Sequence, residues 1–214
     1  MNRKLVLTTI SVIILIGMLG LSFKVQRVEA SGTIYIEADG LVEGTDKMVT
    51  VDNVTYTFTD NNYLPIVVNR SDIIINGAGY TLQVSGGIGF YLEYPVNNVT
   101  IENTTVTNSD YGIDLNGSYN DTLSDNNVTG NTYYGIGVHY SYSSGGTTLS
   151  GNDVTANGYG IFTEWSDNCT LSGNNVSANS QYGISIQNCA YDVLSDNKVA
   201  ANGGEGISLF FCSG

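Results

Sequence analysis

Residues 159–181 read YGIFTEWSDNCTLSGNNVSANSQ, and the same pattern begins again at Tyr182-Gly183-Ile184. The Gly-apolar pair within it recurs along the chain at intervals of 23, 23, 25, 23 and 23 residues. Its copies are Gly89-Phe90, Gly112-Ile113, Gly135-Ile136, Gly160-Ile161, Gly183-Ile184 and Gly206-Ile207. A Leu column and a Val column repeat in the same register. The chain therefore consists of tandem units of about 23 residues.

Each unit holds three short pieces in which apolar and polar residues alternate. In the quoted unit these pieces are Ile161-Phe162-Thr163, Thr170-Leu171 and Asn175-Val176. They are too short for helices, and the Asn, Gly and Ser residues between them favour tight turns. One coil cannot bury its own apolar face, whereas a stack of coils can. The sequence therefore predicts an all-β solenoid of three-sided coils, a parallel β-helix.

Two columns of Asn fall where turns are expected, on either side of the Val column. The first contains Asn103, Asn126, Asn152, Asn174 and Asn197, and the second contains Asn108, Asn131, Asn157, Asn179 and Asn202. Neighbouring strands lie about 4.8 Å apart, so stacked amides can hydrogen-bond to each other along the axis. Asn also tolerates the left-handed backbone of a sharp turn. We predict that both columns are structural ladders.

The repeat pattern YGI-x-[LVI]…[TV]-L-S-x-N-x-V…N resembles a known family. It is similar to the right-handed parallel β-helix (PbH1) repeats of the NosD-type and carbohydrate-associated (CASH) families. The stretches GTIYI at residues 32–36 and IIINGAGYTL at residues 73–82 are similar to the opening of archaeal surface β-helix proteins. The resemblance covers residues 32–214 and implies a right-handed, single-stranded β-helix. It implies no particular activity, because this fold hosts lyases, hydrolases, adhesins and passive stalks.

Three segments are expected along the chain. Residues 1–30 have the form of a signal peptide or N-terminal anchor, with an apolar run from Leu5 to Phe23 and a small-residue cleavage site at Val28-Glu29-Ala30. Residues 31–63 are predicted to be a β-rich cap, and residues 64–214 the β-helix. The last coil has no atypical capping repeat, so we expect truncation at the C-terminus. The bulk of the chain is predicted to be extracellular or at the cell surface, touching a membrane only through an uncleaved N-terminal segment.

The charge balance excludes some partners. Without residues 1–30 the chain keeps three basic and nineteen acidic residues, a net charge of −16. This is incompatible with a basic nucleic-acid binder, because too few cations remain to neutralise phosphates. We expect no resident cofactor, although the negative field would attract Ca²⁺. Nine N-x-S/T sequons suggest a glycoprotein; they begin at Asn53, Asn69, Asn98, Asn103, Asn116, Asn120, Asn127, Asn168 and Asn175.

The signatures of β-helix enzymes are missing from the sequence. Arg70, the only Arg after residue 30, has no cluster of acids around it, and the motifs of polygalacturonase-like helices do not occur. Copper, with which NosD-type relatives are associated, prefers imidazole and sulfur ligands. The chain offers only His139, Met48 and three Cys after residue 30. We therefore expect a non-catalytic extracellular module without a metal site. Two alternatives stay open: part of a polysaccharide lyase or hydrolase with catalytic coils beyond residue 214, and a NosD-like maturation factor for a metal enzyme.

One constellation suggests a ligand. His139 and Glu164 occupy the same outward slot of consecutive coils, and Tyr140 and Trp165 occupy the next slot. Strand spacing places such neighbours about 5 Å apart. An aromatic face beside hydrogen-bonding groups suits a neutral sugar, whose C–H face stacks and whose hydroxyls bond. We predict binding of a neutral polysaccharide or cell-surface glycan here. The alternative is that these are ordinary turn residues shielding the coil edges.

Two further columns follow the same period. The tyrosines that precede each Gly are expected to form an aromatic ladder; they are Tyr111, Tyr134, Tyr159 and Tyr182. Cys189 and Cys212 are one period apart and should be neighbours in consecutive coils. In-register neighbours point their Cβ atoms in the same direction, so the distance between the two Cβ atoms is larger than a disulfide prefers. Two alternatives therefore stay open, a strained disulfide and a stack of two thiols. Cys169 has Asp192 as its counterpart and is expected to stay unpaired.

Overall fold

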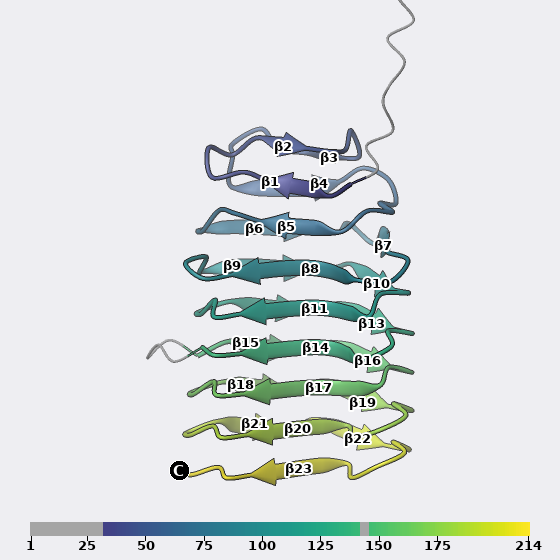
Figure 1. Ribbon diagram of the computed structural model, residues 1–214, viewed down its shortest axis with the longest axis vertical. Helices are drawn as coiled ribbons and strands as arrows, with labels where there is room; N and C mark the ends of the chain where they lie inside the picture. The colour runs from purple at the N-terminus through teal and green to yellow at the C-terminus, as the bar shows by residue number, and fades with distance from the viewer. Residues whose placement is uncertain (1–31, 142–145) are drawn as a thin grey trace, which may run out of the picture. The chain divides into compact units, whose positions relative to one another are not determined.

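Three stacks of short strands make up the part of the chain that the computed structural model describes, residues 32–141 and 146–214 (Figure 1). Sheet A has the order β2 (Val42–Glu43), β1 (Ile34–Ile36), β5 (Ile66–Val68), β8 (Ile88–Glu93), β11 (Tyr111–Asn116), β14 (Tyr134–His139), β17 (Tyr159–Glu164), β20 (Ile184–Gln187), β23 (Ile207–Phe210). Sheet B has the order β21 (Val193–Ser195), β18 (Thr170–Ser172), β15 (Thr148–Ser150), β12 (Thr122–Ser124), β9 (Val99–Glu102), β6 (Ile73–Asn76), β4 (Thr55–Phe58), β3 (Met48–Val49). Sheet C has the order β22 (Lys198–Ala200), β19 (Asn175–Ser177), β16 (Asp153–Thr155), β13 (Asn127–Thr129), β10 (Thr105–Thr107), β7 (Thr81–Gln83).

From β5 to β22 each coil contributes one strand to each sheet, and equivalent strands pair in parallel and in register. Ile161 of β17 lies between Ile136 and Ile184 of the neighbouring coils. Each coil forms one rung of the stack in Figure 1. The predicted all-β parallel β-helix with coils of about 23 residues is therefore confirmed.

The core is built from the columns that define the sequence repeat. Leu residues of sheet B and Val residues of sheet C are fully buried at the middle of three-residue strands; examples are Leu123, Leu149, Leu171, Val128, Val154 and Val176. The repeating Gly is required by close approach. A Cβ on Gly160 would lie 2.5 Å from the carbonyl oxygen of Gly183 and 2.5 Å from Val176 Cγ1, so no larger residue fits between the coils.

The N-terminal region shares its sheets with the coils that follow. The segment predicted as a cap, residues 31–63, contributes β1 to sheet A and β4 to sheet B, each parallel to the next coil. The short strands β2 and β3 pair antiparallel with β1 and β4 at the outer edges. They cover strand edges that would otherwise be free to pair with another chain.

The predicted signal peptide or anchor, residues 1–30, lies outside the described residues. Among the residues that are described, no helix has the length and apolar character needed to span a membrane.

Both Asn columns form continuous hydrogen-bonded ladders from their second member onward. Asn152 Nδ2 donates to Asn174 Oδ1 at 3.0 Å, and Asn174 Nδ2 donates to Asn197 Oδ1 at 2.9 Å. In the second column Asn157 Nδ2 donates to Asn179 Oδ1 at 3.1 Å. Each amide also bonds to the backbone of a neighbouring coil, as Asn174 Nδ2 does with the Leu149 carbonyl at 2.9 Å. The remaining members bond in the same way: Asn126, Asn131 and Asn202.

The first member predicted for each ladder is wrong. The register pairs Thr105 with Asn127, which sets Thr104, and not Asn103, opposite Asn126. The Thr104 N–H donates to Asn126 Oδ1, and Asn103 is an exposed residue with φ of 52°. The second ladder starts likewise at Ser109 rather than at Asn108. Thr104 and Ser109 can begin the ladders because the Oδ1 atom of the next Asn accepts a hydrogen bond only from their backbone N–H.

Candidate functional site

The turn that follows sheet A carries three exposed aromatic side chains in a backbone conformation that disfavours them, and the third is Phe211 after β23. Tyr140 and Trp165 directly follow β14 and β17, with φ of 59° and 52°, and they are 46% and 43% exposed. The register puts Gly117 and Asn188 at the same position of the flanking coils, with φ of 77° and 53°. Gly and Asn adopt this left-handed region readily, whereas bulky residues do so at a cost. Neither the backbone nor burial explains Tyr140 and Trp165.

His139 directly precedes Tyr140, and the centroids of the two rings lie 6.3 Å apart. It pairs in register with Asn116 and Glu164, as the sequence predicted. Its Nε2, however, lies 3.6 Å from Asp114 Oδ1, and its side chain is only 15% exposed. The glycine at position 137 makes this possible, because a Cβ there would come within 2.7 Å of His139 Nε2. The imidazole therefore fills the space that Gly137 leaves on the outer face of sheet A.

Aromatic rings enclose the His139–Asp114 pair. The imidazole lies 5.4 Å from the Phe162 ring and 5.8 Å from the Tyr134 ring, centroid to centroid. Tyr134 stacks on Phe162 at 4.8 Å. The predicted Tyr column continues on both sides, with centroid distances of 5.3 to 5.4 Å between successive rings of Tyr111, Tyr134, Tyr159 and Tyr182.

Burial sets the protonation of the pair. It raises the pKa of Asp114 to about 6 and lowers the pKa of His139. At neutral pH the carboxylate is therefore ionised and the imidazole neutral. Among the described residues Asp114 Oδ1 receives no hydrogen bond. The negative charge of Asp114 therefore lies among aromatic rings, and its Oδ1 atom can still accept a hydrogen bond.

Sequence reasoning missed three members of this region: Asp114, Gly137 and Phe162. The signal that would have revealed them is a break in a column. Asp114, Gly137 and Phe162 occupy the same position of three consecutive coils. The middle coil has a glycine there, which leaves a space between the carboxylate of Asp114 and the ring of Phe162. We call Tyr140, Trp165 and Glu164 the platform, and Asp114, Gly137 and His139 its support.

The two stacked cysteines lie in the turns after β20 and β23, where Cys189 is buried and Cys212 is exposed. Both are free thiols. The Ser213 N–H donates to the Cys189 carbonyl at 3.1 Å, which fixes the neighbouring register of Cys189 and Cys212. Each Sγ donates to a backbone carbonyl, that of Gln187 at 3.0 Å and that of Ile186 at 3.3 Å. Cys169 is also free, and its N–H donates to Asp192 Oδ1 at 2.8 Å.

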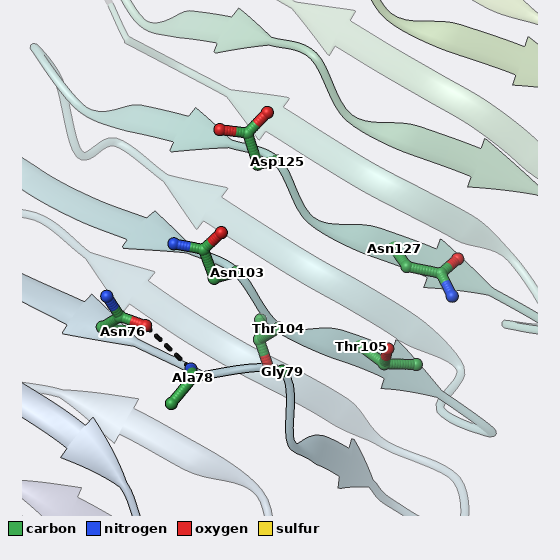
Figure 2. A pocket seen from close by; sticks show the side chains of 8 residues that line it. All are labelled: Asn76, Ala78, Gly79, Asn103, Thr104, Thr105, Asp125 and Asn127. Carbon is green, nitrogen blue, oxygen red and sulfur yellow. Dashed lines mark hydrogen bonds between the residues drawn. The ribbon is translucent and has the colours of Figure 1, made fainter.

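A surface groove lies on the corner between sheets B and C. Figure 2 shows its lining, in which short polar side chains of three consecutive coils surround an open surface groove. The lining residues are Asn76, Ala78, Gly79, Asn103, Thr104, Thr105, Asp125 and Asn127. Asn76 Oδ1 accepts the Ala78 N–H at 2.7 Å and is therefore used by the turn itself. Unlike the platform, this groove has no aromatic residue in its lining.

The family model described as periplasmic copper-binding protein (NosD) matches residues 30–214. The chain belongs to the NosD family. No curated protein and no solved structure shows significant similarity to it. The NosD match covers every coil described above and the residues just before β1.

The copper binding named in the NosD description can be tested against the ligands of this chain. Within residues 32–141 and 146–214, no three His, Cys, Asp or Glu side chains converge on a metal position. His139 faces Asp114 and aromatic rings, and Met48 is buried at 4% exposure in the core beside β4. Burial raises the pKa of the Cys189 thiol, which disfavours the thiolate that copper requires. The described residues do not fit a copper site.

Proposed function

We propose that this NosD-family protein is a non-catalytic β-helix module that acts outside the cytoplasm and binds neutral glycans at the platform. The observation that carries the proposal is that Tyr140 and Trp165, both exposed on a left-handed backbone, occupy equivalent positions of consecutive coils next to Glu164. An exposed aromatic residue gains little from burial, and here it also bears a conformational cost. A ligand that stacks on the two neighbouring rings would account for the pair, whereas Tyr191 has the same left-handed backbone and is also exposed but lies outside it.

A sugar ring matches the chemistry of the platform. Its C–H face stacks on an indole or phenol ring, and its hydroxyls donate to carboxylate oxygens. Glu164 directly precedes Trp165 and lies partly exposed at the end of β17. The net charge of −16 outside residues 1–30 repels anionic polymers, which favours a neutral glycan.

The location follows from two supports. The sequence of residues 1–30 has the form of an export signal. The NosD family is described as periplasmic. A glycan-binding module in such a compartment would meet wall or surface polysaccharides.

The test is binding to an array of neutral glycans, compared between the wild-type chain and Trp165→Ala. We expect wild-type binding that weakens at least about tenfold in the variant, the equivalent of one stacking contact. Tyr191→Ala is the matched control, because Tyr191 is also a 70% exposed aromatic residue with φ of 60° but lies outside the platform. Unchanged binding in Trp165→Ala, or no binding by the wild-type chain, would contradict the proposal.

A further inference from the structure

In the turn between sheets A and B, most coils have Asn at the corner and Thr two positions later. Its corner residues are, in order, Asn98, Asn120, Gly146, Asn168 and Tyr191, and two positions later come Thr100, Thr122, Thr148, Thr170 and Val193. The residue between each pair points into the turn and is buried in the coils of Asn98, Asn120, Gly146 and Asn168. Four coils present N-x-T sequons at this corner, since Asn53 and Thr55 occupy the equivalent positions before and in β4. The coil with Gly146 has no Asn there.

Backbone geometry alone accounts for the recurrence of the motif. Asn98, Asn120 and Asn168 have φ of 56°, 60° and 60°, a region that Asn tolerates well. Thr favours the outward position of a strand. The sequons on this corner are therefore no evidence of modification by themselves. Accessibility of the amide nitrogen decides whether they can act as acceptors.

The structure separates the sequon amides into engaged and unengaged groups. Asn98 Nδ2 donates to Asp72 Oδ1 at 2.6 Å, Asn116 Nδ2 donates to the Tyr91 hydroxyl at 3.2 Å, and Asn175 Nδ2 donates to Asp153 Oδ1 at 2.8 Å. Asn69 Nδ2 is engaged by Glu37 Oε2 at 3.1 Å. Asn120 and Asn168 are exposed, and their Nδ2 atoms donate no hydrogen bond among the described residues. The same holds for Asn53, Asn103 and Asn127.

We propose that Asn120 and Asn168 are N-glycosylation sites. In the modification, the amide Nδ2 forms a bond to the anomeric carbon of an oligosaccharide activated as a lipid pyrophosphate. The bond from that carbon to the pyrophosphate oxygen breaks, the lipid pyrophosphate leaves with the electron pair, and the amide loses one proton to the transferase. The Thr hydroxyl two residues on is the recognition element of the acceptor.

The two glycans would stand on one line along the axis. Two strand spacings, about 10 Å, separate their attachment points, with the Gly146 coil between them. Each glycan would project from the corner into solvent without displacing a described hydrogen bond. Glycans on Asn116 or Asn175 would break the contacts with Tyr91 or Asp153.

The test uses the full chain, produced with its own N-terminal segment in an exporting host that carries an oligosaccharyltransferase for N-x-S/T acceptors. Glycopeptide mapping of the purified chain should find glycans on Asn120 and Asn168, and unmodified peptides for Asn116 and Asn175. Thr122→Ala should remove the glycan from Asn120 only, and Thr170→Ala from Asn168 only.

Thr148→Ala is the matched control, since Thr148 lies between Thr122 and Thr170 in the same column but follows Gly146 in place of Asn. It should change neither site. Unmodified Asn120 and Asn168 peptides in the wild-type chain would overturn the proposal. So would glycans on these residues that persist after the Thr substitutions, or occupancy of Asn116 at a level equal to theirs.

Discussion

The two ladder corners and the corner after sheet A follow opposite rules. At the ladder corners the same residue recurs in coil after coil, and the amides of Asn126, Asn152, Asn174 and Asn179 are at most 1% exposed. At the corner after sheet A the residue changes with every coil, from Gly117 through Tyr140 and Trp165 to Asn188, while the backbone stays left-handed. Repetition marks the positions that hold the stack together. Variation on a constant backbone marks the positions that are free to serve another purpose.

The largest expected effect is the loss of one ladder amide. Asn174→Leu removes the bonds to Leu149, Asn197 and the Asn152 amide, and leaves several buried polar groups without partners. We expect the free energy of unfolding to fall by roughly 3 to 4 kcal/mol, measured by urea denaturation.

The adjacent Asn is the control for that variant. Asn175 points outward, and its bond to Asp153 is exposed. Asn175→Leu should therefore cost no more than about 0.5 kcal/mol. Equal losses in the two variants would remove the distinction between ladder and surface amides.

Asp121 is a buried carboxylate in the turn between sheets A and B, and it makes the stability of the protein depend on pH. Asp121 is 1% exposed, and its oxygens accept the Val99 N–H at 2.9 Å and the Ser118 hydroxyl at 2.6 Å. Burial raises its pKa from 3.8 to about 6, so the folded state favours the protonated form. Its contribution to stability is present at low pH and is lost as pH rises from about 4 through 6.

Asp121→Asn installs the neutral amide that the ladders use. We expect the stability of the variant relative to wild type to increase by roughly 2 to 3 kcal/mol between pH 4 and pH 7. Urea denaturation at the two pH values measures this. Asp125→Asn, which changes an exposed carboxylate of the same coil, is the control. Parallel stability curves for Asp121→Asn and wild type would show that the buried carboxylate costs nothing.

A substitution that fills the space beside Gly137 tests whether this space holds the His139 imidazole. Gly137→Ala places a Cβ within 2.7 Å of the present position of His139 Nε2, so the imidazole has to move toward solvent. We expect the pKa of His139 to rise toward its ordinary value, because burial is what lowers it. The cost in stability should be about 1 kcal/mol. NMR titration follows the change directly, since His139 is the only histidine. If the titration of His139 were unchanged, the imidazole would not occupy the space beside Gly137.

The smallest effect is expected at the platform itself. Trp165→Asn introduces the residue found one coil further on, at Asn188, in the same left-handed backbone. Relief of the backbone cost should offset the lost contacts, so the melting curve should stay within about 0.5 kcal/mol of wild type. A loss above about 1 kcal/mol would instead make Trp165 a shield for the coil edges.

The sequence by itself determined the fold and most of its internal bonding. The period of 23 residues and the Leu, Val and Gly columns specify stacked coils, because only a stack buries such short apolar pieces. The hydrogen bonds of the buried Asn residues from Asn126 onward could be predicted from the sequence, since each amide has its partner in the Asn one period further along the chain. The same reasoning failed for Asn103, where a shift of one residue separates a buried ladder position from an exposed corner.

Only the tertiary structure decided which side chains serve the candidate site. His139 and Glu164 share a column, yet the space left by Gly137 draws the imidazole toward Asp114 and away from solvent. A periodic pattern gives the position of each Cα along the stack, but it does not give the direction in which a long side chain folds over a missing neighbour. The backbone conformation of Tyr140 and Trp165 is likewise invisible in sequence, because it is set by a turn that the coils from β11 to β23 share.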